Sequence, residues 1–174
     1  DEIENLGLAE PAILPLDLEK ASFAQMQELA NLIEKEFGHL DGVLHNAAIL
    51  GALTPLEMYD PITFEQVMRV NSTAVFMLTQ SLLPLLKAAQ SGSVVFTTST
   101  VGHDLRPFWG AYALSKQSVE GMTTIFTQET QKLTALRFNC INPGATRTNM
   151  RAHAFPGEDP NTLKTPEEIM AVYV

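Results

Sequence analysis

Short apolar runs alternate with long amphipathic segments along the chain, and this order constrains the fold more than any other feature. Four apolar runs are expected to form strands, at residues 12–18, 41–48, 93–99 and 135–141. Three segments between them place apolar residues at helical spacing, at residues 20–37, 60–88 and 111–132. Strands joined by helices in this way form parallel sheets, because a parallel connection needs a long crossover. We therefore expect one α/β domain over residues 1–174, a doubly wound parallel sheet with helices on both faces.

Composition excludes several classes of partner. Of the 174 residues 45% are hydrophobic, which is enough for a substantial core. Lys and Arg number 11 against 20 Asp and Glu, a net charge of −9 that argues against nucleic acid and anionic membranes as partners. No apolar run reaches the roughly 18 residues of a membrane-spanning helix. Cys140 is the single cysteine, so no internal disulfide can form and we expect a cytoplasmic protein. No metal is expected, because no His, Cys, Asp or Glu cluster has ligand spacing.

Tyr112, Lys116 and Ser99 carry the strongest chemical signal. Tyr112 and Lys116 share one face of an expected helix, and Ser99 ends the preceding strand, where ligands bind in open α/β sheets. A free tyrosine has a pKa of about 10, too high for acid–base work at neutral pH, and a neighbouring ammonium lowers it. A serine hydroxyl can stabilise charge on a substrate oxygen. Tyrosine and lysine at this spacing also occur on ordinary surface helices. The pair indicates an active site only in combination with Ser99.

Asn71 lies on the apolar stripe of the 60–88 segment. A buried amide costs about 1–3 kcal/mol unless its hydrogen bonds are made. Taken alone, Asn71 is interpreted as a packed asparagine bonded to a neighbouring element.

Together, Asn71, Ser99, Tyr112 and Lys116 resemble the catalytic tetrad of the short-chain dehydrogenase/reductase family. The motif His45-Asn46-Ala47-Ala48 is similar to the family's N-N-A-G, and Asn142-Pro143-Gly144 with Thr148 is similar to its P-G-x-x-x-T turn. Asp17, followed by Leu18, matches an acidic residue that contacts adenine. Within the family, the stretches VLHNAAILG, PFWGAYALSK and NCINPGATRTNMRAHAFP look closest to the YciK-like oxidoreductases.

The resemblance implies a Rossmann-type fold and an enzyme that transfers a hydride between NAD(P)(H) and a small carbonyl or alcohol substrate. It implies that Tyr112 is the general acid/base and that Ser99 orients the substrate carbonyl. Lys116 would lower the tyrosine pKa and hold the nicotinamide ribose, while Asn71 would order a water in a proton relay. The other matched residues would bind the cofactor: Asp17 and Leu18 at adenine, Asn46, Ala47 and Ala48 along the adenosine side, and Pro143, Gly144 and Thr148 at the carboxamide.

The Gly-rich turn that holds a dinucleotide pyrophosphate does not occur in the sequence. The resemblance therefore implies a chain that lacks the first two strands of its fold, on the order of 60 residues. We expect this segment alone to be inactive and not to hold a dinucleotide. The choice between NAD and NADP, which depends on residues of that region, is left open.

Several alternatives are weighed beside the enzyme. A non-catalytic nicotinamide-sensing or oligomerisation module could use the same fold, but such proteins usually lose the tyrosine or the lysine. Arg147 and Arg151 are either ligands for an anionic substrate group or ordinary exposed arginines. Trp109 lies in a loop that shapes a substrate pocket or only connects two elements. The resemblance also implies a homodimer or homotetramer formed by the two long helices, whose outer faces are expected to carry Phe76, Met77, Met122 and Phe126.

Overall fold

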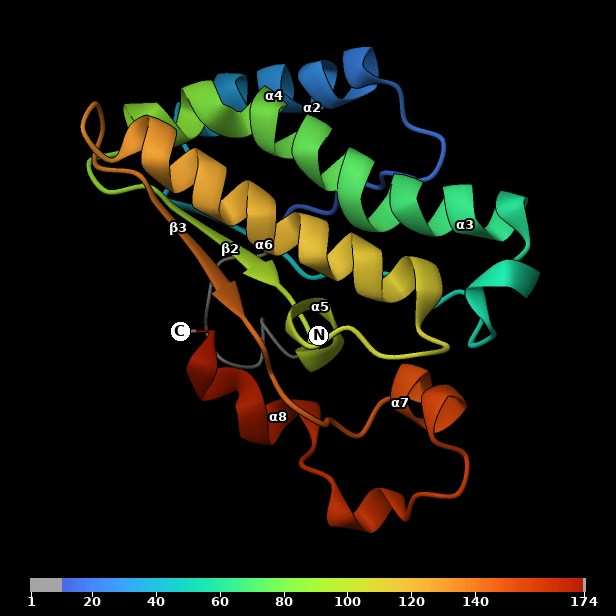
Figure 1. Ribbon diagram of the computed structural model, residues 1–174. Helices are drawn as coiled ribbons and strands as arrows, with labels where there is room; N and C mark the ends of the chain where they lie inside the picture. The colour runs from blue at the N-terminus through green and yellow to red at the C-terminus, as the bar shows by residue number, and fades with distance from the viewer. Residues whose placement is uncertain (1–10, 174) are drawn as a thin grey trace.

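The computed structural model describes residues 11–173, and its centre is a parallel sheet (Figure 1). The strands are β1 (Gly42–His45), β2 (Ser93–Thr97) and β3 (Arg137–Ile141), in the order β1-β2-β3. Both pairings are parallel, with Gly42 opposite Ser93 and Ser93 opposite Arg137. Three of the four expected strands are thus confirmed, and because they run parallel, their carboxyl ends lie along one edge of the sheet.

The long helices form one layer over this sheet (Figure 1). They are α2 (Phe23–Phe37), α3 (Pro61–Met68), α4 (Ala74–Ala88) and α6 (Gly110–Thr130). A π-helical turn, Arg69–Thr73, joins α3 to α4, so the expected 60–88 helix is continuous. Helix α2 packs against α4, and α6 packs against β2 and β3. The shorter elements are η1 (Leu56–Met58), α5 (Thr100–His103), α7 (Asn149–Ala154), η3 (Pro160–Thr162), α8 (Pro166–Ile169) and η4 (Met170–Val172).

Side chains of the sheet and helices explain this layering. In β2, Val94 and Phe96 are fully buried, whereas Ser93, Val95 and Thr97 between and beside them are only partly buried. This period of two presents one face of the strand to the helices. The main core joins Val94 and Phe96 to Leu86 of α4 and Phe138 of β3.

Local signals set where the helices begin. Ser22 and Gln25 form a capping box at the start of α2, which ends at Gly38 with φ of 78°. The Asp60 side chain accepts a hydrogen bond from the Thr63 amide and caps α3. Pro84 lies inside α4, which continues to Ala88, so it does not end the helix.

The strand expected at residues 12–18 is not formed, and this prediction was wrong for the structure as described. Residues 11–17 have no regular structure, and a turn follows at 18–20. A strand needs a hydrogen-bonded neighbour, and the described sheet contains only β1, β2 and β3. Leu16 and Leu18 still pack against Met26 and Ala74, while Ile13 is 81% exposed. The apolar side chains of this segment therefore hold it against α2 and α4, but without a neighbouring strand it does not become a β-strand.

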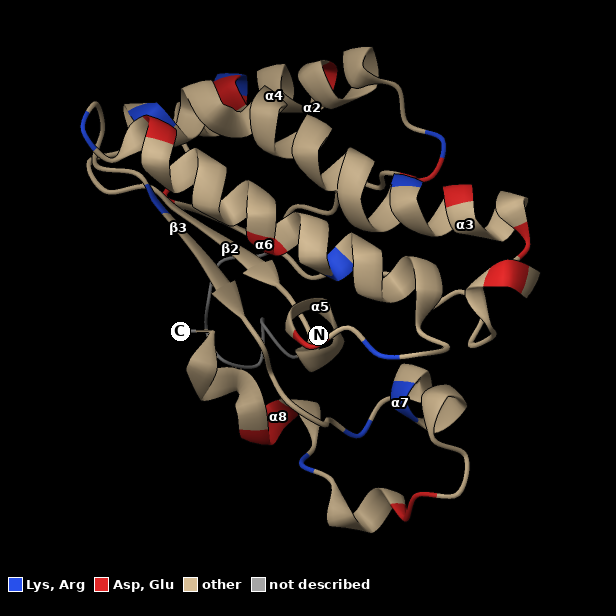
Figure 2. Cartoon of the chain, viewed as in Figure 1, with Lys and Arg blue, Asp and Glu red and all other residues tan. Residues whose placement is uncertain are grey.

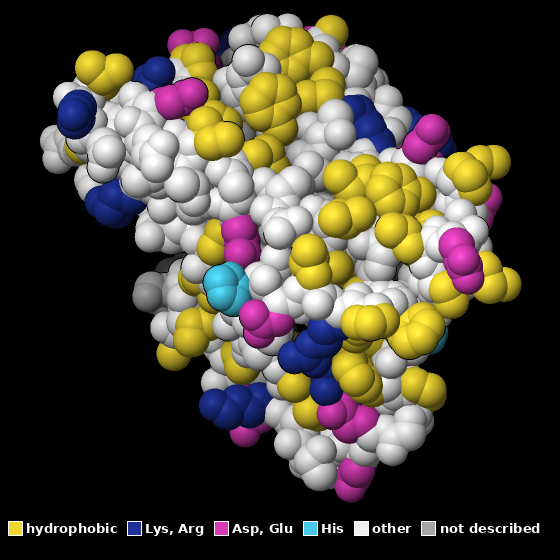
Figure 3. Space-filling view, viewed as in Figure 1, with side chains coloured by type: hydrophobic (Ala, Val, Ile, Leu, Met, Phe, Trp, Pro, Cys, Tyr) yellow, Lys and Arg dark blue, Asp and Glu magenta, His cyan; other side chains and the backbone are white. Residues whose placement is uncertain are grey.

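Charge is distributed unevenly over the helices. Figure 2 shows α4 almost free of acidic and basic residues, and its sequence contains Lys87 alone among them. Figure 3 shows hydrophobic side chains in patches over the helices that face the viewer. Within residues 11–173, no helix combines the length and the hydropathy needed to cross a membrane.

Candidate active site

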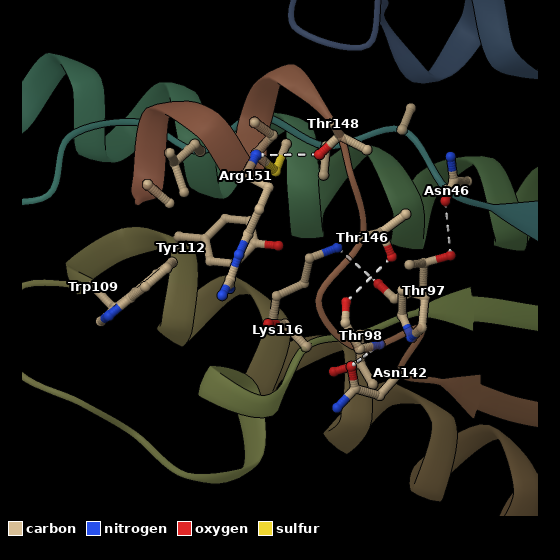
Figure 4. A pocket seen from close by; sticks show the side chains of 18 of the residues that line it. Asn46, Thr97, Thr98, Trp109, Tyr112, Lys116, Asn142, Thr146, Thr148 and Arg151 are labelled. Atoms are coloured by element: carbon tan, nitrogen blue, oxygen red, sulfur yellow. Dashed lines mark hydrogen bonds between the residues drawn. The ribbon is translucent and has the colours of Figure 1, made fainter. Parts of the chain in front are cut away.

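A cavity of about 400 Å³ opens where the strands end, beside α6 and α7 (Figure 4). Its walls come from four parts of the chain: the loop after β1, the end of β2, the start of α6, and the segment from Asn142 to Phe155. Nine predicted site residues line it: Asn46, Ala47, Ala48, Ser99, Tyr112, Lys116, Pro143, Gly144 and Thr148. The structure therefore brings together most of the predicted site.

Ser99 and Tyr112 meet because α5 packs tightly against α6. Ser99 precedes α5 in an extended conformation, with φ of −155° and ψ of 153°. A Cβ at Gly102 would lie 2.7 Å from the Cβ of Lys116, so only glycine allows this approach of the two helices. Burial raises the pKa of Tyr112, and a side-chain hydrogen bond with Ser99 partly offsets that effect.

The neighbours of Ser99 are anchored on both sides. The Thr98 hydroxyl donates to Glu120 Oε1 at 2.7 Å, and the Asn142 amide donates to the Thr100 hydroxyl at 3.0 Å. The Thr98 amide also donates to the Ile141 carbonyl at 2.8 Å, which extends the β2–β3 pairing. The backbone that carries the Ser99 side chain is thereby fixed at the cavity.

Lys116 is buried, and its ammonium faces the end of β2 (Figure 4). Its Nζ donates to the Thr97 carbonyl at 2.7 Å and lies 5.7 Å from the centre of the Tyr112 ring. Burial lowers the pKa of Lys116 to about 8, with a smaller opposing effect of Cys140. The expected lowering of the Tyr112 pKa by Lys116 is not found here, because burial dominates at the tyrosine and the ammonium is bound to a carbonyl.

Asn71 is the tetrad member that the structure does not bring to the cavity wall. Its side chain, 1% exposed, bonds to the backbone of Ile49 and donates to the Ser115 hydroxyl at 3.1 Å. The hydrogen-bonding groups of the Asn71 side chain therefore all have partners, as expected for a packed asparagine. Asn71 itself lies in the π-helical turn between α3 and α4.

Of the residues predicted to bind the adenosine side of the cofactor, all but Asp17 line a cavity. Leu18, Asn46 and Ala47 line a second, smaller cavity of about 110 Å³, and Asn46 and Ala47 also line the main one. The Asn46 side chain accepts from the Thr97 hydroxyl at 3.1 Å. Asp17 lines neither cavity, since its carboxylate accepts from the amides of Glu19 and Lys20 and caps the turn there.

The predicted carboxamide-side residues lie in the turn after β3. The Asn142 side chain accepts from the Gly144 amide at 3.1 Å, and Gly144 has φ of 76°, which favours glycine. The Thr148 hydroxyl accepts from the Arg151 amide at 3.1 Å and caps α7. This end of the cavity presents hydroxyl and amide groups and the Lys116 ammonium, which fit the hydroxyls and carboxamide of a dinucleotide.

The opposite end of the cavity is apolar and aromatic. Leu50, Trp109 and Met150 pack beside Tyr112, and Phe155 lies beyond Trp109. The Trp109 ring centre is 6.0 Å from that of Tyr112 and 5.8 Å from that of Phe155. Trp109, which the sequence placed in a loop of undecided role, therefore lines the cavity and shapes it.

Arg151 and Arg147 have partners within the chain. Arg151 Nε and Nη2 donate to the two carboxylate oxygens of Glu158 at 2.6 and 2.7 Å, and its guanidinium lies 3.7 Å from the Phe155 ring centre. The hydrogen bond from Arg151 lowers the pKa of Glu158. Arg147 donates to the Leu163 carbonyl and does not line the main cavity.

Trp109, which the sequence offered as a pocket residue, stands three positions before Tyr112, a spacing that places it near the same surface of α6. Other lining residues were missed because the sequence gives no signal for them. Phe155 and Met150 reach the cavity only through the fold of the segment after β3, and no motif marks them. Across residues 11–173, no three His, Cys, Asp or Glu side chains come together as a metal site requires.

The comparisons with known proteins agree with this geometry. The family model described as short chain dehydrogenase matches residues 1–159, and the chain belongs to this family. It is 50% identical over 165 residues to the oxidoreductase YciK of Escherichia coli, covering 95% of this chain and 65% of that protein. The chain thus spans about two thirds of the length of this relative.

Solved structures of similar proteins superpose closely. A short-chain dehydrogenase from Pseudomonas syringae gives a TM-score of 0.96 at 50% identity, covering 99% of this chain and 70% of the other. One from Shigella flexneri, complexed with NADP, gives 0.94 at 49% identity, covering 98% of this chain and 70% of the other. The Rossmann-type parallel fold is thereby confirmed.

Proposed function

We propose that the protein containing this chain is an oxidoreductase that transfers a hydride between NAD(P)(H) and a carbonyl or alcohol substrate. The observation that carries this proposal is the meeting of Ser99, Tyr112 and Lys116 at one cavity beyond the strand ends. The NADP complex of the Shigella flexneri relative supports a nicotinamide cofactor for this chain as well. Cofactor residues would be Leu18, Asn46, Ala47 and Ala48 toward adenosine, and Pro143, Gly144 and Thr148 toward the carboxamide.

The chain's residues would move one proton during carbonyl reduction. When bound, the cofactor supplies the hydride that forms the new C–H bond at the carbonyl carbon and is itself oxidised. Tyr112 is protonated at neutral pH, since burial raises its pKa. It donates its hydroxyl proton to the substrate oxygen, because the alkoxide that forms there is a stronger base than the tyrosinate. Ser99 donates a hydrogen bond to the same oxygen as negative charge develops. Lys116 holds the ribose hydroxyls with its ammonium, and Asn71 positions the loop after β1.

Tyr112→Phe tests this mechanism, because it removes the proton donor and keeps the ring. In the whole protein, turnover with NADPH or NADH and a panel of carbonyl compounds should fall by about 10²–10⁴-fold, while NADPH binding followed by fluorescence persists. Tyr59→Phe is the matched control, since Tyr59 is equally buried, at 8% exposure, but does not line the cavity. Undiminished turnover in Tyr112→Phe would refute the proposed role.

A sensing module is the competing function. It would bind NADPH but reduce no carbonyl compound in the panel, and Tyr112→Phe would then change nothing measurable.

The long helices would also support a homodimer or homotetramer. Of the four outward residues expected from the sequence, Phe76 is 42% exposed, whereas Met77, Met122 and Phe126 pack toward core clusters. Ile125 on α6, 56% exposed, joins Phe76 as an apolar residue on these helices. The apolar faces are thus smaller than expected but still present on α4 and α6.

A further inference from the structure

The cavity is divided into a polar end and an apolar end, and Tyr112 lies between them. Hydroxyl and amide groups gather where the strands end, whereas Trp109, Phe155 and Met150 form the wall on the other side of Tyr112. Polar groups of a ligand would find hydrogen-bond partners mainly at the polar end, where the strands end. A ligand group at the second end gains free energy mainly by burying apolar surface.

The aromatic wall is continuous. Ring centres in contact lie about 4.5–7 Å apart, and the Trp109–Phe155 distance of 5.8 Å shows that these rings already touch. A substrate ring therefore cannot enter between them and would stack against the wall. Because Trp109 also contacts Tyr112 at 6.0 Å, a ring on this wall lies close to the proton donor. A substrate that fits carries its ring next to the carbonyl.

Among the described residues that line this end, Arg151 is the one cation, and its charge is compensated. Arg151 lines the cavity, but Glu158 binds its Nε and Nη2 through both carboxylate oxygens, and its guanidinium covers Phe155. Both side chains are partly exposed, at 26% and 28%. A carboxylate on the substrate would have to compete with Glu158 for this guanidinium and would bring uncompensated negative charge beside it.

Resting on the function proposed above, we propose that the substrate is an uncharged carbonyl compound with a flat apolar ring next to the carbonyl, and that Glu158, by pairing with Arg151, excludes carboxylated analogues. Trp109 supplies the surface that binds the ring. Glu158 touches neither the reacting atoms nor the cofactor side of the cavity, so it acts on specificity through Arg151.

Three aldehydes test this proposal in the whole protein with NADPH: benzaldehyde, 4-carboxybenzaldehyde and propanal. We expect kcat/KM for benzaldehyde to exceed that for each of the other two by about tenfold or more. Trp109→Ala should lower the value for benzaldehyde by about tenfold more than the value for propanal, while Trp109→Phe keeps most of the benzaldehyde activity. A preference for 4-carboxybenzaldehyde, or an equal loss for all three in Trp109→Ala, would overturn the proposal.

Glu158→Gln gives the sharper test, since it removes the competing charge and keeps the shape. The ratio of kcat/KM for 4-carboxybenzaldehyde to that for benzaldehyde should rise by about tenfold. Glu129→Gln, which removes an exposed carboxylate from α6, should leave this ratio unchanged. An unchanged ratio in Glu158→Gln would refute the role of Glu158.

Binding without turnover separates this inference from the proposed function. Trp109 is the single tryptophan of the chain, so fluorescence quenching that disappears in Trp109→Phe reports ligands at the wall. Benzyl alcohol should bind at least about tenfold more tightly than benzoate. If it does while no aldehyde is reduced, the substrate-site inference stands and the oxidoreductase proposal fails. If aldehydes are reduced but benzoate binds more tightly, the inference fails and the oxidoreductase proposal stands.

Discussion

Asn71 clamps the backbone of Ile49 through both ends of its side-chain amide. Its Oδ1 accepts from the Ile49 N–H and its Nδ2 donates to the Ile49 carbonyl, each at 2.8 Å. This pair ties the π-helical turn between α3 and α4 to the loop after β1, which carries Asn46, Ala47 and Ala48 along the cavity. Asn71 is thus bonded to a neighbouring element, as the sequence suggested for a packed asparagine, and we expect it to position this loop.

Asn71→Ala should therefore loosen that loop. It leaves the Ile49 N–H and carbonyl without partners, which should cost about 1–3 kcal/mol of the free energy of unfolding. Hydrogen exchange at the Ile49 amide should quicken more than at amides of β2. Ser115→Ala is the control, since it removes the 3.1 Å bond to Asn71 and keeps the clamp. Unchanged exchange at Ile49 in Asn71→Ala would contradict the positioning role.

The sequence predicted the parts of the site that depend on local spacing. Tyr112 and Lys116 are one helical turn apart, and Ser99 follows a strand, so helix periodicity and the strand end were enough to place them at one cavity. The parallel order of β1, β2 and β3 likewise followed from strands alternating with helices.

The parts that depend on distant segments could not be predicted. Phe155 reaches the cavity, and Glu158 reaches Arg151, through the segment that follows α7, and the Arg151–Glu158 pair has no sequence signature. The direction of the Tyr112 pKa shift depends on how strongly burial, which raises the pKa, outweighs the hydrogen bond with Ser99, which lowers it, and spacing in the sequence does not give this balance. Residues 12–18 have the composition of a strand, but pairing depends on which strands lie beside them.

Lys116 predicts a pH dependence of cofactor use. Its pKa of about 8 means that the ammonium is present at neutral pH and is lost as the pH rises through that value. Because kcat/KM for NADPH follows ionisations of the free protein, it should fall above pH 8 by up to about tenfold for each pH unit. Lys116→Arg keeps its charge at high pH, so its profile, although lower, should lack this inflection. A wild-type profile that stays level to about pH 9.5 would exclude the role of the ammonium.

The exposed apolar residues of α4 and α6 predict self-association. Phe76→Glu combined with Ile125→Glu places charge on the exposed apolar positions of α4 and α6 and should shift the whole protein to a monomer in light scattering. Leu133→Glu, at an 82% exposed position beyond the end of α6, should leave the assembly unchanged. A wild-type protein that is monomeric at micromolar concentration would remove the basis of this prediction.

His45 predicts an acid-sensitive contribution to stability. The imidazole stacks on Phe96 with ring centres 5.1 Å apart, and its Nε2 lies 2.9 Å from the Thr79 hydroxyl. Burial lowers the pKa of His45 from 6.5 to about 4, so between these pH values the unfolded chain binds a proton that the folded chain does not. The neutral His45 side chain therefore contributes fully to the free energy of unfolding above pH 6.5. As the pH falls to 4, the free energy of unfolding should decrease by up to about 3 kcal/mol. Urea unfolding across this range should show the decrease in the wild type, whereas His45→Phe, which keeps an aromatic ring on Phe96 but cannot titrate, should lose most of it. His39→Phe, at an exposed position, should retain the wild-type slope. The same slope in His45→Phe as in the wild type would show that other groups control the acid sensitivity.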